Sequence, residues 1–336
     1  MQKILIIQTA SIGDVILATP VLEALHSRFP EAGIDFLLKK GIENVFRGHP
    51  FLHEVIIWDK SKKKYRNLYS VFRKIRKNKY TLIVNIQRFA ASGFLTAFSR
   101  SRVSVGFDKN PFSEFFSIKV KHNILEGGNT LHETERNLLL VESFTGKTQF
   151  SIRLYPTPQD VENVKTYRQT PYICIAPASL WFTKQFPAGK WIQFVRSLNN
   201  TYMIYLLGSK SDYTLCESII TDNPDSKIVN LAGKLSFLQS AALMQNAVMN
   251  YVNDSAPLHL ASAVNANVAA IFCSTIPGFG FGPLSQNSVV IETQQKLPCR
   301  PCGLHGKKQC PEGHFNCAET IEIEQLLQQL PCTPKK

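Results

Sequence analysis

Residues 253–259, N-D-S-A-P-L-H, have the types and spacing expected of an anion-binding turn. The apolar run 247–251 predicts a buried strand in front of them, and Pro257 suits the first turn of a helix behind them. Asp254 and Ser255 therefore lie at a helix start, where free backbone N–H groups and the helix dipole favour an anion such as a diphosphate. His259 by itself indicates a packed or capping residue. Turns of this kind also occur in sheets that bind nothing, so other stretches must support a binding function.

A second polar loop, T-A-S-I-G-D at residues 9–14, follows the apolar run 3–8. Ser11 and Gly13 allow close approach of another backbone or a ligand, and Asp14 stands at the start of the next helix. A carboxylate there can cap the helix, and it can also serve as a general base. The two roles are compatible, and both are kept.

A third loop, residues 176–187, comes after the apolar run 172–176 and ends where another helix begins. Ser179 and Thr183 offer hydroxyls, and Lys184 offers a flexible cation. Hydroxyls and a lysine at the carboxyl end of a strand suit a phosphate group. An exposed lysine in an ordinary loop is the alternative.

The apolar runs that carry these loops alternate with helical patterns along the whole chain. Such alternation predicts an α/β fold with parallel, doubly wound sheets. A more polar stretch at 146–170 separates two such series, so we expect two Rossmann-like domains, 1–155 and 156–336, that face a central cleft. A long amphipathic helix is expected at 130–144. Further strands are expected at 34–38, 54–58, 81–86, 203–207, 228–231 and 268–272.

The composition limits the class of protein. The chain has 336 residues, 44% of them hydrophobic, and no run long enough to span a bilayer. Its first residues read as a strand and lack a cleavage site, so a cytoplasmic location is expected. Neither G-x-G-x-x-G nor G-x-x-x-x-G-K-[ST] occurs, which counts against classical dinucleotide enzymes and P-loop NTPases.

A basic stretch at residues 60–79 contributes strongly to the net charge of +13. It predicts contact with an anionic partner, such as a membrane surface or a phosphorylated glycan; a solvated helix face is the alternative. Nucleic acid is not expected, because no recognisable module interleaves stacking aromatic residues with the basic ones.

Four cysteines cluster near the C-terminus with the spacing C-x2-C-x7-C-x6-C. This pattern predicts a small structural zinc site, to which His305 or His314 could contribute. Two disulfides or four free thiols are the alternatives. The residues are Cys299, Cys302, Cys310 and Cys317.

Taken together, these motifs resemble glycosyltransferase family 9, the ADP-heptose:lipopolysaccharide heptosyltransferases. The opening I-G-D-V-I-L-A-T-P-V-L-E-A-L, the K-x-[FW]-P at Lys184 and the D-[ST]-[GA]-x-x-H at Asp254 are similar to the family's motifs and occur in the same order. The tail C-R-P-C…C-P-x-G-H-x-x-C is similar to that of many members. Gln8 departs from the pattern, because several relatives carry lysine or arginine there.

The resemblance implies a GT-B fold with an N-terminal acceptor-binding half and a C-terminal half that binds a nucleotide-diphosphate sugar. It implies an inverting, metal-independent transfer of a sugar, expected to be heptose from ADP-heptose, onto an anionic lipopolysaccharide core at the inner leaflet. Asp14 then matches the proposed general base. Ser179 and Lys184 match groups that bind the donor phosphates. Asp254 and Ser255 match groups against the donor sugar and diphosphate, and His259 matches a histidine with a structural role.

Two other functions remain open at this stage. A hydrolase or epimerase acting on nucleotide sugars could use the same scaffold, and it would release nucleoside diphosphate without an acceptor. A non-catalytic anion- or membrane-binding homologue is the other alternative, although the presence of both Asp14 and Lys184 argues against it.

Overall fold

The computed structural model describes residues 2–123, 125–126 and 129–331, and it divides into two compact units, Met1–Tyr155 and Pro156–Lys336. The predicted domain ranges also include residues 1, 124, 127–128 and 332–336, which lie outside the described residues. Each unit is built around one parallel six-stranded sheet with its own core, and is described by itself.

The first unit has the strand order β3-β2-β1-β4-β5-β6. Its central strand β1 (Lys3–Ile7) forms because four consecutive apolar residues, Ile4 to Ile7, are fully buried between the layers of helices. The other strands are β2 (Gly33–Lys39), β3 (Leu52–Trp58), β4 (Leu82–Asn85), β5 (Val103–Phe107) and β6 (Ile118–Val120), and β7 (Leu125–Glu126) pairs with β8 (Asn129–Thr130). The helices are α1 (Ile12–Leu17), α2 (Thr19–Arg28), α3 (Lys64–Asn78), α4 (Ala90–Ala97), α5 (Glu133–Leu139) and α6 (Glu142–Thr145), with the 3-10 turns η1 (Glu43–Phe46) and η2 (Ser113–Phe115).

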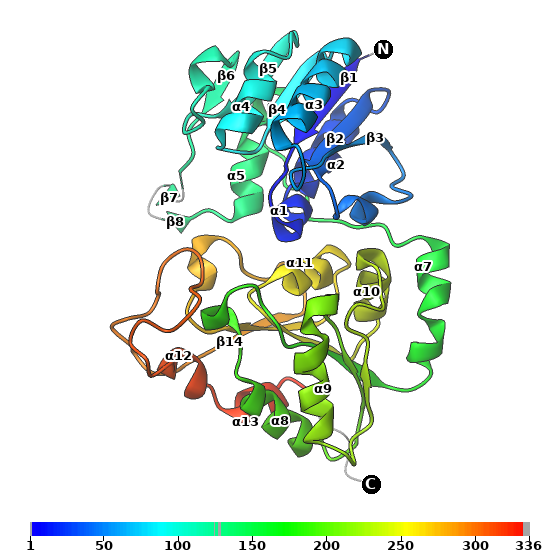
Figure 1. The fold of residues 1–336 in the computed structure, drawn as a ribbon, viewed down its shortest axis with the longest axis vertical. Coiled ribbons are helices and arrows are strands. Elements are labelled where there is room, and N and C mark those ends of the chain that lie inside the picture. The colour runs from blue at the N-terminus through cyan, green and yellow to red at the C-terminus, as the bar shows by residue number, and fades with distance from the viewer. Residues whose placement is uncertain (1, 124, 127–128, 332–336) are drawn as a thin grey trace. The chain divides into compact units, whose positions relative to one another are not determined.

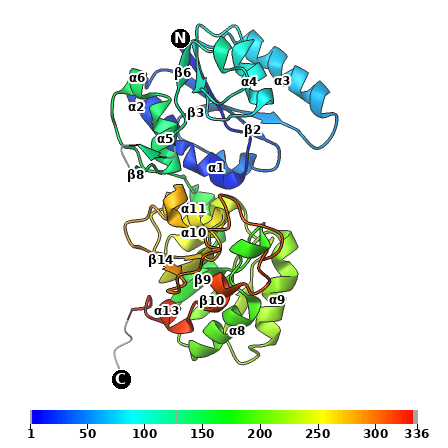
Figure 2. The same ribbon diagram turned by 90° about the vertical axis from the view of Figure 1, so that its left-hand side faces the viewer.

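The second unit repeats this order as β11-β10-β9-β12-β13-β14. Figures 1 and 2 show α8 and α13 on one side of its sheet and α10 and α11 on the other. The strands are β9 (Tyr172–Ala176), β10 (Met203–Leu206), β11 (Ile228–Asn230), β12 (Met249–Asn253), β13 (Val268–Phe272) and β14 (Ser288–Glu292). The helices are α7 (Pro158–Asn163), α8 (Ala188–Ser197), α9 (Tyr213–Thr221), α10 (Phe237–Met244), α11 (Ala256–Ala263), α12 (Asn316–Glu319) and α13 (Ile323–Leu327), with the 3-10 turns η3 (Lys165–Arg168), η4 (Phe182–Lys184), η5 (Lys210–Asp212) and η6 (Pro277–Phe279).

These two parallel sheets confirm the predicted α/β fold. Trp191 and Phe194 of α8 pack in the core of the second unit together with Tyr251 of β12. The hydroxyl of Tyr251 donates a hydrogen bond to the carbonyl of Leu326 at 2.8 Å, so the last helix is tied to a central strand. Among the described residues, no helix is long and apolar enough to cross a membrane.

Two predicted segments differ from the structure. The expected helix at 130–144 is divided into α5 and α6, because Leu140 and Val141 turn inward and are buried between them. The polar stretch 146–170 is not all linker, since Thr157 caps α7 within it and accepts a hydrogen bond from the N–H of Asp160 at 3.2 Å.

Candidate active site

The strand order reverses at one place in each sheet, between β1 and β4 and between β9 and β12. Ligands of doubly wound sheets bind outside the carboxyl ends of the strands at such a point. All three loops selected from the sequence begin there, after β1, β9 and β12. The fold therefore puts the candidate residues where chemistry is expected.

Asp14 stands in the first turn of α1, where it forms a capping box with Ser11. Its Oδ2 accepts hydrogen bonds from the backbone N–H of Ser11 at 2.9 Å and from the Ser11 hydroxyl at 2.5 Å. Gly13 is buried beside it. The predicted capping role of Asp14 is thus observed. The same two hydrogen bonds hold its partly buried carboxylate in one orientation.

The loop before Asp14 is fixed by a lysine that the sequence had grouped with the basic surface. Lys60 Nζ donates to the carbonyl and the hydroxyl of Thr9, at 2.7 and 2.8 Å, and lies 4.4 Å from the ring centroid of Trp58. Burial, reinforced by the charges of Lys39 and Lys64, lowers the pKa of Lys60 to about 8. This lysine is a support of the Thr9–Asp14 loop.

A second carboxylate near Asp14 was missed by the sequence reasoning. Burial raises the pKa of Glu133 on α5, the ion pair with Arg136 opposes that rise, and the charge of Asp14 adds to it. Nothing in the local sequence brings residues 14 and 133 together; helix packing does.

In the second unit, Lys184 and Asp254 form an ion pair, with Lys184 Nζ 2.6 Å from Asp254 Oδ2. The same oxygen accepts a hydrogen bond from the Thr275 hydroxyl at 2.6 Å, and Asp254 is only 5% exposed. Two residues 70 positions apart in the sequence are thus joined at the carboxyl edge of the sheet. Thr275, which follows β13, was not predicted as part of this site.

Asn253 explains why the loop after β9 meets the turn after β12. Its Oδ1 accepts a hydrogen bond from the N–H of Phe186 at 2.9 Å, and its Nδ2 donates to the carbonyl of Pro177 at 2.8 Å. Both ends of the β9 loop are thereby attached to β12. Ser179, within that loop, is half-buried.

The turn after β12 forms as predicted. Ser255 is the N-cap of α11 and Pro257 lies in its first turn, while His259 is buried within the helix. The Ser255 hydroxyl makes no capping bond to the helix. It donates a long hydrogen bond, at 3.4 Å, to the carbonyl of Asn253.

Thr183 differs from the other hydroxyl residues because it is 1% exposed. Its Oγ1 accepts hydrogen bonds from the N–H of Lys307 at 2.8 Å and from the Ser274 hydroxyl at 3.0 Å. The Thr183 side chain thus joins three loops and fixes the backbone next to Lys184.

The cysteine-rich segment 299–317 reaches this site from the end of β14. Cys299, Cys302 and Cys310 are partly exposed thiols and Cys317 is a buried one, and none of the four is in a disulfide. Burial, with smaller contributions from the neighbouring cysteines, raises the pKa of Cys317 to about 12. In the part of the chain that the structure describes, no three His, Cys, Asp or Glu side chains are grouped so as to hold a metal ion. The predicted zinc site therefore finds no support in this arrangement.

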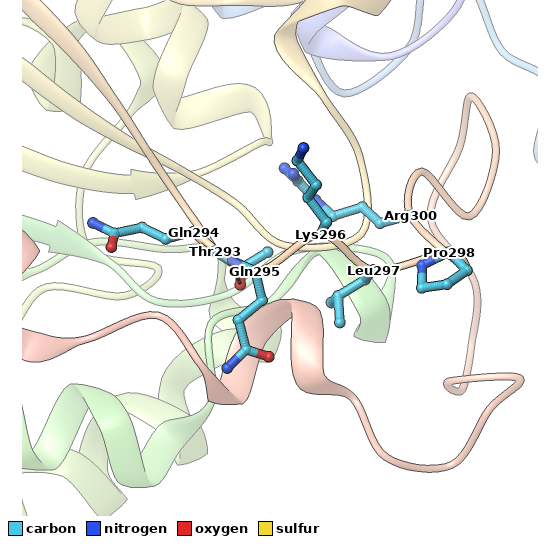
Figure 3. Close-up of a pocket in the computed structure, with 7 residues that line it drawn as sticks. All are labelled: Thr293, Gln294, Gln295, Lys296, Leu297, Pro298 and Arg300. Carbon is cyan, nitrogen blue, oxygen red and sulfur yellow. Dashed lines mark hydrogen bonds between the residues drawn. The ribbon is translucent and has the colours of Figure 1, made fainter.

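A pocket of about 490 Å³ lies beside this segment, in the stretch that follows β14. Figure 3 shows its cationic side chains, Lys296 and Arg300. The Arg300 guanidinium is occupied: it donates to the carbonyls of Cys273 and Thr275, at 2.7 and 2.9 Å, and pairs with Glu292. The pocket contains none of the predicted site residues.

The basic stretch 60–79 forms α3 and the turn before it, and exposed aromatic rings accompany it. Centroid distances of 5.0–6.4 Å connect the rings of one row, which crosses from α3 over α4 to η2. Its members are Tyr69, Phe72, Phe94, Phe98 and Phe115, which we call the aromatic row; Tyr69, Phe98 and Phe115 are exposed. Not every cation nearby is available, since Lys74 is paired with Glu54.

Known proteins similar to this chain include heptosyltransferases. Lipopolysaccharide heptosyltransferase 3 of Escherichia coli is 27% identical over 294 residues, which cover 82% of this chain and 85% of that protein. A solved glycosyltransferase family 9 protein of Veillonella parvula superposes with a TM-score of 0.85 at 19% identity, over 98% of this chain and 96% of that one. The structure of the E. coli heptosyltransferase WaaC with ADP-2-deoxy-2-fluoro heptose superposes with a TM-score of 0.75 at 17% identity, over 98% of this chain and 99% of that one.

The solved structures share the GT-B fold, and the sequence match extends over both units. The model of glycosyltransferase family 9 (heptosyltransferase) matches residues 68–314, a range that contains β9, β12, Lys184 and Asp254. Because this match covers more than half of the chain, the chain belongs to glycosyltransferase family 9.

Proposed function

We propose that the protein transfers heptose from ADP-heptose to a lipopolysaccharide core acceptor, with inversion at the anomeric carbon and without a catalytic metal. The observation that carries the proposal is the Lys184–Asp254 pair beside the start of α11, in a chain of this family. Two of its relatives, a lipopolysaccharide heptosyltransferase and a heptosyltransferase solved with ADP-2-deoxy-2-fluoro heptose, support the class of donor and acceptor.

For the donor, we propose that Lys184 and the hydroxyls of Ser179 and Ser255 contact the diphosphate, with Asp254 against the sugar. The leaving diphosphate gains negative charge as the glycosidic bond breaks. An ammonium, hydroxyls and a helix N-terminus stabilise that charge when they are already oriented before reaction. Thr183 and His259 serve this part of the site from buried positions.

For the acceptor, we propose Asp14 as the general base. The acceptor oxygen attacks the anomeric carbon as its proton passes to an Asp14 carboxylate oxygen. The bond between that carbon and the diphosphate oxygen breaks, and ADP leaves with the electron pair. Ser11 and Gly13 keep the carboxylate in position, and Asp14 becomes available again when it releases the proton to water.

The test is ADP release in the presence and absence of a deacylated lipopolysaccharide core that lacks the terminal heptose. The proposal expects ADP release that depends on the acceptor, and a product heavier by one heptose. Equal release without acceptor indicates the hydrolase alternative. Binding of ADP-heptose with no turnover of any core indicates the non-catalytic one.

We further propose that the enzyme works at the cytoplasmic face of the inner membrane, held there by α3 and the aromatic row. Lysine and arginine attract anionic headgroups, at about 1 kcal/mol each near the surface, and aromatic rings favour the interface between headgroups and acyl chains. The exposed rings next to a basic helix supply both contributions.

A further inference from the structure

The cysteine-rich segment 299–317 makes a reciprocal link to the loop that carries Lys184. The N–H of Thr183 donates to the carbonyl of Lys307 at 3.1 Å, and the N–H of Lys307 donates to Thr183 Oγ1 at 2.8 Å. These two hydrogen bonds join residues 124 positions apart, and Thr183 directly precedes Lys184 in the sequence. The segment is therefore attached to the backbone of η4.

Gly306 is the point of closest approach. A Cβ added there would lie 2.5 Å from Cβ of Trp181, 2.6 Å from Cγ of Lys184 and 2.9 Å from its Cδ. Gly303 and Gly313 in the same segment have positive φ and open space around them, so their need for glycine is conformational. At Gly306 the need is steric, because the segment's backbone lies directly on the stem of Lys184.

The segment also reaches the Asp254 side of the pair. The N–H of Cys302 donates to the carbonyl of Ser274 at 3.0 Å, and Arg300 donates to the carbonyl of Thr275. Thr275 in turn donates its hydroxyl to Asp254. Both partners of the ion pair are thus supported from one stretch of chain.

The far end of the segment is anchored in the core. Cys317 and Phe315 are buried among the apolar residues of the second unit, and Cys310 packs against them. The segment is thus held at both ends, and Gly306 and Lys307 lie between its attachments.

We propose that segment 299–317 is a positioning element of the donor site, in which Gly306 and Lys307 hold Lys184 on Asp254. This inference rests on the proposed role of Lys184 in binding the donor diphosphate. In this view the segment serves to fix the shape of the β9 loop. Gly306 and Lys307 act through Lys184 and need not contact the donor themselves.

The test is Gly306→Ala, with Gly189→Ala as the matched control. Gly189 lies in the first turn of α8 with open space around its Cα, so an added methyl group there meets nothing. We expect Gly306→Ala to weaken ADP binding about tenfold or more by calorimetry and to raise the donor KM, with the acceptor KM unchanged. Gly189→Ala should behave like the parent. An ADP affinity within twofold of the parent, in a folded Gly306→Ala protein, overturns the proposal.

A double-mutant cycle separates positioning from general damage. If Gly306 acts through Lys184, Gly306→Ala should cause no further loss of ADP affinity in a Lys184→Ala background. An equal loss in both backgrounds overturns the proposal. A second pair of variants tests the hydrogen bond from the N–H of Lys307 to the Thr183 hydroxyl. Thr183→Val, which lacks the hydroxyl, should weaken ADP binding, and Thr183→Ser, which keeps it, should bind ADP like the parent. Equal ADP affinities of the two variants contradict a role for this hydrogen bond.

These measurements also keep the two proposals apart. A parent protein that binds ADP but transfers no heptose fails the proposed reaction, while the ADP titrations still decide the role of Gly306. If the parent transfers heptose and Gly306→Ala leaves the ADP affinity unchanged, the proposed reaction stands and the proposed positioning role of segment 299–317 is overturned.

Discussion

Lys184 Nζ and Asp254 Oδ2 lie 2.6 Å apart, and the same carboxylate oxygen accepts a hydrogen bond from the Thr275 hydroxyl. The Asp254 carboxylate therefore compensates the charge of the Lys184 ammonium and orients it. A buried ion pair costs desolvation, and removing one partner leaves the other charge uncompensated. A diphosphate that approaches this pair meets a cation whose position is already fixed.

Lys184→Ala should weaken ADP binding by roughly 10- to 150-fold, the equivalent of about 1.5–3 kcal/mol for a hydrogen bond to a charged group. Isothermal calorimetry measures it. Lys165→Ala, which removes an exposed lysine paired with Glu162, is the control and should leave ADP affinity unchanged. Unchanged affinity in Lys184→Ala would exclude this lysine from the donor site.

Asp14→Asn should lower kcat by about two to four orders of magnitude while leaving ADP affinity near that of the parent, because it removes the base and keeps the side-chain size. Asp160 occupies the same position in the capping box of α7. Asp160→Asn should therefore lower thermal stability and leave kcat in place. Near-normal turnover in a folded Asp14→Asn protein would rule out the base.

Lys60 should make stability depend on pH. Its pKa in the folded protein, about 8, lies below the ordinary lysine value near 10.4. Between these values the unfolded chain binds more protons, so this contribution to stability rises as pH increases from about 8 to about 10. Below about pH 8 both states are protonated, and the cost of burying the charge is fully present.

Urea unfolding of the parent and of Lys60→Met at about pH 7 and about pH 9.5 checks this expectation. The stability of the parent relative to Lys60→Met should improve at the higher pH. Lys62→Met, which alters an exposed lysine, should show no such change relative to the parent. A pH-independent difference for Lys60→Met would contradict the lowered pKa.

Binding to anionic vesicles should depend on two separable parts of the first unit. Lys62, Lys63 and Lys64 changed together to Gln should reduce binding most at low and moderate salt, because salt screens charges at the surface. Phe98→Ser with Phe115→Ser should reduce binding at high salt as well, since apolar contact is not screened.

The control for the aromatic pair is Tyr213→Ser, which removes an exposed ring from the second unit. It should bind vesicles like the parent. A parent protein that ignores anionic vesicles would remove the proposed membrane surface, and equal losses in Tyr213→Ser would show that the aromatic row has no special part in it.

The sequence sufficed for the sheets because buried parallel strands are continuous apolar runs. The run 172–176, for example, is β9 exactly as the structure bounds it. The prediction from sequence failed where packing overrides a local pattern. At Leu140–Val141, for example, one predicted helix is two helices in the structure. At 157–160 the signal was present but unused, since Thr157 and Asp160 have the spacing of a capping box inside a stretch whose polarity indicated a linker.

The candidate site divides in the same way. Asp14, Lys184 and Asp254 could be selected because each follows a predicted strand. Thr275 and Gly306 could not, because their importance depends on contacts across the fold. The nearest neighbours of a Cβ at Gly306 lie more than 100 positions earlier in the chain, and no periodicity or spacing records that distance.

The attachment of α13 to β12, through the hydrogen bond from Tyr251 to the carbonyl of Leu326, affects how the protein folds during its synthesis on the ribosome. The first unit is continuous and ends at Tyr155, whereas the second cannot close its core until α13 has been made. At 5–20 residues per second, roughly 10–35 s separate these two moments. Until α13 has been made, the apolar residues of this core that Leu326 covers remain exposed, so the nascent second unit offers apolar surface that a chaperone can bind, while the first unit can already be folded.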